Sequence, residues 1–215
     1  MIDGIVYGED PKQGFIEQNV FYHPVLKFQF DIPSSWAVQN TPEQVQMAAQ
    51  DNKALMLLTL APEGSLESAA NAVLKNYQLT LVESKKGTVN GQAMIAMIAD
   101  QVSDEQQSLR TLIYVIQNGK NNYAMIGVSP VPLFDSYVNV FRGSMESFKT
   151  LTDQSKINKQ PERIRIKTVQ QNGTLSQALK NHGTNEKRME EVSILNGMKL
   201  SDKVDKGMLI KIIDE

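Results

Sequence analysis

The chain has 215 residues, of which 41% are hydrophobic and 21% are charged, as is typical of a globular protein with one large or two small domains. Its formal net charge of -2 gives no electrostatic basis for binding nucleic acid or an anionic membrane. It contains no cysteine, which excludes disulfides and thiol catalysis, and no apolar run of about 18 residues that would predict a transmembrane segment.

The opening stretch, "IVYGEDPKQGF" at residues 5–15, has the composition of a loop because Gly8, Pro11 and Gly14 interrupt any regular period. A loop normally connects two elements, and this one has no predicted element before it. We therefore expect residues 1–19 to lead out of an upstream domain, with Met1 as an internal or introduced start.

Residues 20–150 predict mostly antiparallel strands with two helices. Alternation in "LKFQFDI" indicates a half-buried strand, the apolar run "ALMLLTLA" indicates a central strand, and Trp36 is expected to pack across the core. Asn-Gly pairs at 90–91 and 118–119 predict two hairpins. Helices are expected at about 65–79, with Ser65 as N-cap, and over "PLFDSYVNVFRGSMESFKTL", whose aromatic stripe should pack on the sheet. This pattern predicts an α+β sandwich.

Residues 151–162 are polar and predict a linker. Residues 163–215 then follow a β-α-α-β pattern, with strands in "RIRIKTV" and "GMLIKII" and helices in "GTLSQALKN" and "NEKRMEEVSILNG". Thr174 is expected to cap the first helix, and Gly197 to end the second in the left-handed conformation. A unit this small is expected to dock on another part of a protein.

Residues that could carry chemistry are sparse. The two histidines, His23 and His182, lie far apart and no HExxH motif is present, so we expect no zinc and no catalytic residue in this chain. His23 is expected to be a hydrogen-bonded structural residue, and His182 to complement a helix C-terminus. Asp100, Asp104 and Glu105 could attract a cation, but they lack EF-hand spacing and a solvated loop is the favoured interpretation.

The stretches "NGTLSQAL", "VSILNGMKL" and "GMLIKI" resemble the LysM family. The resemblance implies a small βααβ domain with a shallow groove for N-acetylglucosamine polymers, between the first loop and the end of the second helix. Along this groove it places Gly173, Thr174, Leu175, Leu195, Asn196, Gly197 and Met198. The alternative is that these residues only build the fold, because Asn172-Gly173 replaces the Gly-Asp pair of the family and two aromatic positions are not aromatic here.

The stretch "FYHPVLKFQFDIPSSW", together with the middle helix, the two hairpins and the closing "ESFKTL", resembles the PsbP-like α/β/α sandwich. This resemblance covers residues 20–150. It implies a fold that serves binding and assembly more often than catalysis.

"VYGEDPKQGF" followed by "HPVLKFQFDIP" and a LysM-like unit resembles the C-terminal region of bacterial HtpX/BepA-like zinc metallopeptidases, which are exported proteases with an HExxH helix. The resemblance implies a non-catalytic accessory region for substrate positioning or for docking to peptidoglycan or envelope proteins in the periplasm. Zinc is then expected in an upstream catalytic domain. Two alternatives are a stand-alone envelope binding protein with a LysM-like anchor and an independent small-molecule enzyme built on the sandwich.

Overall fold

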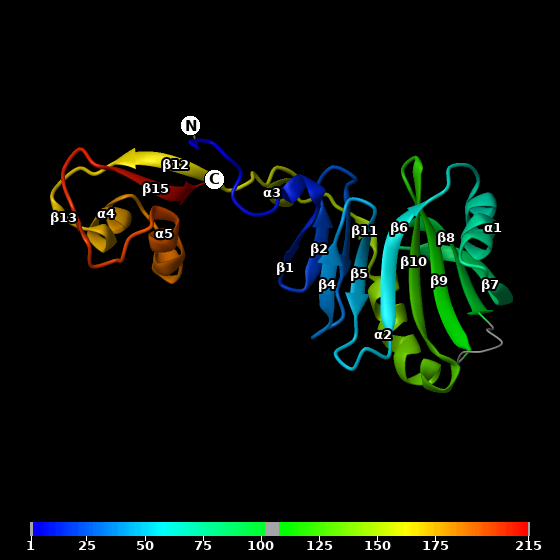
Figure 1. Cartoon of the computed structure of the whole chain (residues 1–215). Coiled ribbons are helices and arrows are strands. Elements are labelled where there is room, and N and C mark those ends of the chain that lie inside the picture. The colour runs from blue at the N-terminus through cyan, green and yellow to red at the C-terminus, as the bar shows by residue number, and fades with distance from the viewer. Residues whose placement is uncertain (1, 102–107, 215) are drawn as a thin grey trace. The chain divides into compact units, whose positions relative to one another are not determined.

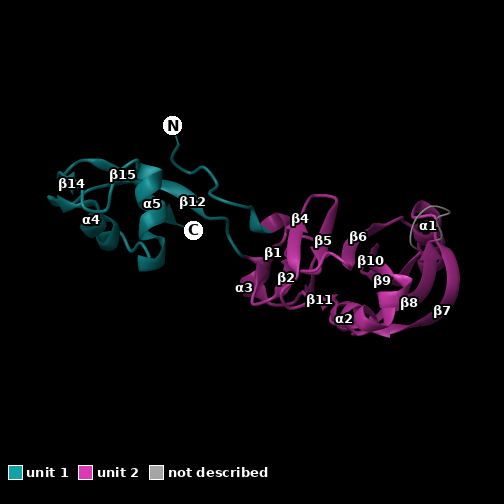
Figure 2. Ribbon diagram, turned by 60° about the horizontal axis from the view of Figure 1, so that its bottom comes forward, with its two compact units in different colours: residues 1–11, 159–215 teal, residues 12–158 magenta. Residues whose placement is uncertain are grey.

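The computed structural model describes residues 2–101 and 108–214, and the chain divides into two compact units (Figures 1 and 2). Unit 1 comprises residues 1–11 and 159–215, and unit 2 comprises residues 12–158. The first eleven residues, which the sequence predicts as a loop leading into the sandwich, thus belong to the same compact unit as the C-terminal region.

The described residues of unit 2 form two antiparallel sheets. The larger has seven strands in the order β4-β5-β6-β10-β9-β8-β7, and the smaller has four in the order β1-β2-β3-β11. The strands of the larger sheet are β4 (Ala37–Asn40), β5 (Gln44–Ala48), β6 (Leu55–Ala61), β7 (Thr80–Val89), β8 (Gln92–Gln101), β9 (Leu109–Asn118) and β10 (Asn121–Pro130). Those of the smaller sheet are β1 (Phe15–Glu17), β2 (Val20–His23), β3 (Phe28–Asp31) and β11 (Lys149–Thr150).

Different elements pack on the two faces of the large sheet. Helix α1 (Leu66–Asn76) packs on one face, while α2 (Phe134–Glu146) and the small sheet cover the other (Figure 1). Along β9, Leu112 and Tyr114 face α2 whereas Ile113 and Val115 face α1, so both faces of this strand are buried. The predicted α+β sandwich with a mostly antiparallel sheet is confirmed.

Aromatic side chains fill the layer between the two sheets. Phe28 lies 5.3 Å from Phe148 and 5.0 Å from Tyr123, measured between ring centroids. The alternation therefore correctly predicted which side chains of this strand are buried. Trp36 packs edge-on against Phe141 of α2 at 6.2 Å, so the aromatic stripe of this helix belongs to the core.

The predicted hairpin turns and the predicted cap of α1 are also confirmed, although the second turn lies one residue later than predicted. Asn90 and Gly91 both have positive φ, 48° and 83°, as a tight hairpin turn requires. In the second hairpin Asn118 pairs with Asn121, so its loop is residues 119–120 rather than the Asn-Gly pair itself. Ser65 caps α1 by accepting a hydrogen bond from the amide of Ser68 at 3.1 Å.

Two boundaries predicted from local patterns are wrong. The closing helix ends at Glu146 and is followed by β11, because Phe148 turns into the aromatic core and Lys149 pairs with Gln29 of β3. The polar stretch after it contains a short helix, α3 (Gln154–Ile157), capped by the side chain of Asp153. The polar composition of residues 151–162 predicts neither the strand pairing before them nor the burial of Leu151.

Unit 1 has the predicted βααβ order, with additional short elements. Its strands β12 and β15 form an antiparallel pair, and β13 and β14 form a second one. The elements are β12 (Arg163–Thr168), β13 (Gly173–Thr174), α4 (Leu175–Asn181), α5 (Met189–Asn196), β14 (Lys203–Val204) and β15 (Leu209–Asp214), with a 3-10 turn at Glu186–Arg188. Unit 2 has similar 3-10 turns at Pro11–Gln13, where the unit boundary falls, and at Val131–Leu133.

Gly127 of β10 tests how closely α2 packs on the sheet. A Cβ atom at this position would lie 2.7 Å from Cδ1 of Phe141, so the ring contacts the strand backbone directly. We expect Gly127→Ala to lower the free energy of unfolding by about 1–3 kcal/mol through overpacking. Urea titration would measure this, with Gly87→Ala in β7 as control, where the nearest atom is 3.6 Å away. Equal stability of the two variants would contradict the close approach.

Candidate binding site in the C-terminal unit

Two segments of unit 1, which border the groove that the LysM resemblance implies, lie side by side, and we call them the two lips. Gly173 and Thr174 pair with Val204 and Lys203. Further along, the amide of Leu175 donates to the carbonyl of Asp202, and the amide of Ser176 donates to that of Leu200, both at 2.9 Å. The structure therefore holds the loop before α4 against the segment that follows α5.

The residues of the first lip mainly build the fold. Thr174 and Gln177 form a capping box, in which the Thr174 hydroxyl accepts from the Gln177 amide at 3.3 Å and Gln177 Oε1 accepts from the Thr174 amide at 2.9 Å. A Cβ atom at Gly173 would lie 2.6 Å from that same Oε1 atom, so glycine permits the box to close. Leu175 is fully buried in the core of the unit.

Asn196 joins α5 to β15. Its Nδ2 donates to the carbonyls of Val192 and Lys211, at 2.8 and 2.9 Å, and its Oδ1 accepts from the Lys211 amide at 2.8 Å. These contacts occupy both amide protons, so the side chain has a structural role in this unit. Gly197 follows with φ of 66°, the predicted left-handed cap.

The remaining two predicted groove residues are half-buried. The carbonyl of Leu195 accepts from Lys211 Nζ at 2.7 Å, and Met198 packs against the core of the unit. All seven predicted residues thus lie in the two lips or in the helix end that supports them. Their contact with a glycan stays a prediction.

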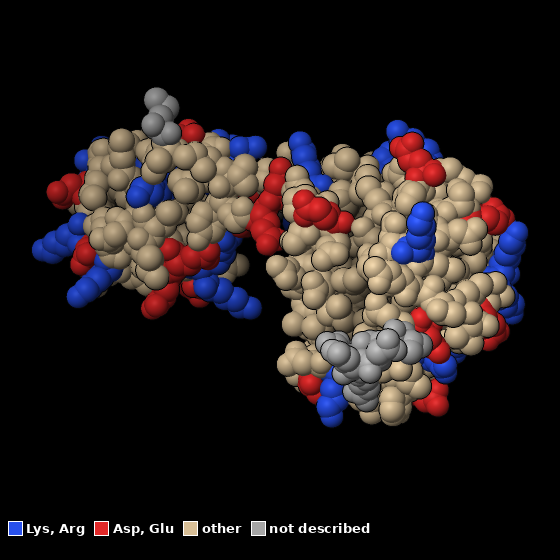
Figure 3. All heavy atoms as spheres, turned by 45° about the vertical axis from the view of Figure 1, so that its right-hand side comes forward, with Lys and Arg blue, Asp and Glu red and all other residues tan. Residues whose placement is uncertain are grey.

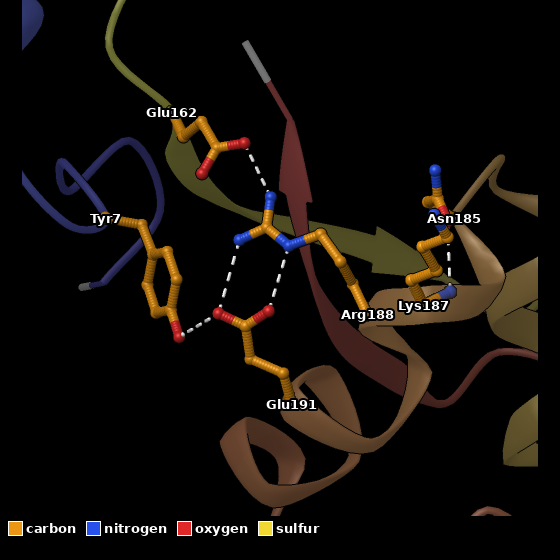
Figure 4. A network of polar contacts seen from close by, with 6 residues as sticks. All are labelled: Tyr7, Glu162, Asn185, Lys187, Arg188 and Glu191. Atoms are coloured by element: carbon orange, nitrogen blue, oxygen red, sulfur yellow. Dashed lines mark hydrogen bonds and ion pairs between the residues drawn. The ribbon is translucent and has the colours of Figure 1, made fainter. Parts of the chain in front are cut away.

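Sequence reasoning missed a polar network centred on Arg188 (Figure 4). Arg188 donates from Nε to Glu191 at 2.9 Å and from Nη2 at 3.2 Å, and its Nη1 pairs with Glu162. The hydroxyl of Tyr7 donates to Glu191 at 2.8 Å, and the Arg188 guanidinium lies 5.9 Å from the Tyr7 ring centroid. One arginine therefore joins the N-terminal segment, the start of β12 and helix α5.

The charges of this network support one another. The hydrogen bonds from Arg188 and then from Tyr7 lower the pKa of Glu191 below its ordinary value. The same bond to Glu191, together with desolvation, raises the pKa of Tyr7. Arg188 stays protonated because both carboxylates raise its pKa. These groups thus form an ion cluster held together by hydrogen bonds.

The backbone of the N-terminal segment adds to the edge of β12. The amide of Gly4 donates to the Ile164 carbonyl at 2.8 Å, the Ile164 amide to the Ile5 carbonyl at 2.9 Å, and the Tyr7 amide to the Glu162 carbonyl at 2.7 Å. Val6 and Arg163 form an antiparallel bridge. The opening stretch is a loop, as predicted, but these hydrogen bonds hold it against β12; local sequence patterns did not predict this contact because the partner is far away in sequence.

The other candidate residues have structural contacts. His23 Nδ1 accepts from the Leu26 amide at 3.3 Å, and burial lowers its pKa. His182 is the C-cap of α4, with Nε2 3.1 Å from the Thr168 carbonyl. Asp100 accepts two hydrogen bonds of 2.8 Å from Arg110, whereas the predicted neighbours of Asp100 at 104 and 105 lie outside the described residues.

A hollow, which the sequence did not predict, lies over β8 in unit 2. It has a volume of 470 Å³, an apolar floor that includes Met94, Ala96 and Ile98, and a wall from α2 that includes Arg142 and Glu146. Within residues 2–101 and 108–214, no three His, Cys, Asp or Glu side chains group as a metal site, and no helix is long and apolar enough to cross a membrane.

Comparisons with known proteins support the fold. No protein-family model and no curated protein matches the chain. Among solved structures, cyanobacterial PsbP (CyanoP) from Synechocystis sp. PCC 6803 is similar, with 13% identity, a TM-score of 0.50, and coverage of 61% of this chain and 91% of that one. LpqN from Mycobacterium tuberculosis, described as involved in cell envelope biogenesis, has 7% identity, coverage of 58% and 83%, and a TM-score of 0.42. The likeness to CyanoP shows a PsbP-like fold.

Asn196→Ala should destabilise unit 1. The substitution removes three hydrogen bonds and leaves the amide of half-buried Lys211 without its acceptor. We expect a loss of about 1–3 kcal/mol in the free energy of unfolding of this unit. Denaturant titration followed by amide signals of α5 and β15 would measure it. A variant as stable as the parent chain would show that the amide is free to serve a ligand.

Proposed function

We propose that this chain is the non-catalytic accessory region of an exported zinc metallopeptidase, and that unit 1 docks it on peptidoglycan. The observation that carries the proposal is the pairing of the two lips in a βααβ unit, with Leu175 and Ser176 hydrogen-bonded to the segment after α5. This is the arrangement that the LysM resemblance implies for a shallow glycan groove.

The exposed positions on the lips favour a polar ligand. Gln171, Lys199 and Ser201 are exposed, whereas the lip residues named above are largely committed to the fold. Since no aromatic face is available on these lips, a glycan would be held by hydrogen bonds to side chains and backbone. On the face in Figure 3, acidic and basic side chains are interspersed on both units, which gives no support to a nucleic-acid partner.

The proposal assigns zinc to an upstream domain. The described residues offer no group of three metal-binding side chains, and the sequence has no HExxH motif. In a parent protease, the N-terminal segment would connect the catalytic domain to unit 1, because residues 4–7 hydrogen-bond to β12 and its approach.

The alternative is a stand-alone envelope binding protein with the same LysM-like anchor. Both proposals share the docking role of unit 1. The length of the natural polypeptide separates them, because a catalytic domain would add substantially to the 24.0 kDa of this chain.

Co-sedimentation with purified peptidoglycan tests the docking role. We expect the chain to bind at high salt, and Ser201→Trp to weaken binding about tenfold or more, because a bulky side chain at this exposed position would obstruct a glycan lying along the lips. Asn181→Trp is the matched control, since Asn181 is exposed at the other end of α4. No retention of the parent chain, or equal loss in both variants, would contradict glycan docking and leave unit 1 as a site for protein partners.

A further inference from the structure

Strand β7 forms a long open edge of the large sheet. It has ten residues, all exposed except Val89, and within residues 2–101 and 108–214 it pairs with β8 alone. Leu81 and Val82 are 46% and 55% exposed. Such an edge presents unpaired amides and carbonyls and can accept another strand.

The register of the β7–β8 hairpin determines which backbone groups point outward. Val89 pairs with Gln92 across the two-residue turn, and in such a turn the flanking residues exchange hydrogen bonds. Alternation then directs the amides and carbonyls of Gly87 and Lys85 toward β8. Those of Lys86 and Ser84 are directed toward the free edge.

The charged side chains of β7 are arranged by face. Glu83 and Lys85 lie opposite Ile98 and Ala96, on the face that lines the hollow beside α2. Within the described residues neither forms an ion pair or side-chain hydrogen bond. By contrast, Lys86 is on the other face and pairs with Glu67 of α1 at 2.7 Å.

We propose that β7 is a self-association surface, on which a second copy of this chain pairs antiparallel around a two-fold axis at Ser84. The two Ser84 residues then exchange backbone hydrogen bonds, and Glu83 of each copy lies opposite Lys85 of the other. Residues opposite each other in such non-hydrogen-bonded pairs have Cα atoms about 4.5 Å apart, so the side chains meet. The contact is isologous, as closed dimers require.

Charge selects this register over its neighbours. A two-fold axis at Glu83 or at Lys85 would place two like charges directly opposite each other, and one at Lys86 would do the same. Opposite charges across a strand pair stabilise it and like charges destabilise it. Of these four axes, only that at Ser84 joins opposite charges, and symmetry makes the favourable pair occur twice.

The competing explanation is that these charges protect the edge. Natural proteins place lysines and bulges on edge strands to prevent pairing, and β7 has a bulge between Leu81 and Glu83. Protection requires only that charges be present, whereas self-association requires that they alternate in sign about one axis. Charge-swap variants distinguish the two explanations.

Sedimentation velocity of the full chain over a roughly hundredfold concentration range tests the proposal. We expect a reversible dimer that weakens with added salt. Lys85→Glu alone, and Glu83→Lys alone, should each weaken the dimer about tenfold, because two attractive pairs become repulsive. The double variant should restore it, and an equimolar mixture of the two single variants should form a heterodimer. Lys75→Glu on exposed α1 is the matched control.

A chain that stays monomeric throughout would overturn the proposal and support edge protection. A dimer that Lys85→Glu and Glu83→Lys leave unchanged would also overturn it, by placing the contact elsewhere. Circular dichroism of each variant would establish that loss of association does not come from unfolding.

Discussion

Backbone hydrogen bonds between residues 4–7 and the start of β12 are the contacts on which the organisation of this chain depends. They bring together two stretches that are separated in sequence by the whole of unit 2. Because residues 1–11 and 159–215 form one compact unit, the PsbP-like sandwich is an insertion within unit 1. The Arg188 cluster reinforces this connection, since Tyr7, Glu162 and Glu191 come from its separate segments.

Because of this connection, the C-terminal unit is more than a free-standing βααβ domain. A free-standing βααβ domain of about fifty residues buries little apolar surface, and such domains are marginally stable. Here the edge of β12 gains backbone hydrogen bonds from residues 4–7, and the hydroxyl of Tyr7 gains a partner on α5. Ion pairs between half-exposed groups each contribute little, but a single guanidinium shared by two carboxylates holds several segments in one geometry.

The sequence predicted the features that depend on neighbours along the chain. Ser65 and Thr174 are helix caps, Gly197 ends a helix, and Asn90-Gly91 forms a turn, each through contacts within a few residues. The largest failures involve distant partners. The pairing of Lys149 with Gln29 converts a predicted helix end into a strand, and Tyr7 contacts Glu191 from 184 positions away.

The candidate site divides in the same manner. The two lips coincide with stretches that carry the LysM resemblance, and their role in binding stays a prediction. The structural role of Asn196 was not predicted, because its partner is on β15. The resemblance to CyanoP shows the fold of the sandwich and leaves its function to be established by binding experiments. The two surfaces proposed for binding, the lips of unit 1 and the edge of β7, belong to different units and can be tested independently.

Native-state amide hydrogen exchange tests the insertion most directly. The account predicts that the amides of Gly4, Tyr7 and Ile164 exchange as slowly as those in the β12–β15 pair, because all of them open only when unit 1 unfolds. Rapid exchange at Gly4 and Tyr7, with the β12–β15 amides still protected, would contradict it. In that case the first eleven residues would move independently of residues 159–215 rather than form one unit with them.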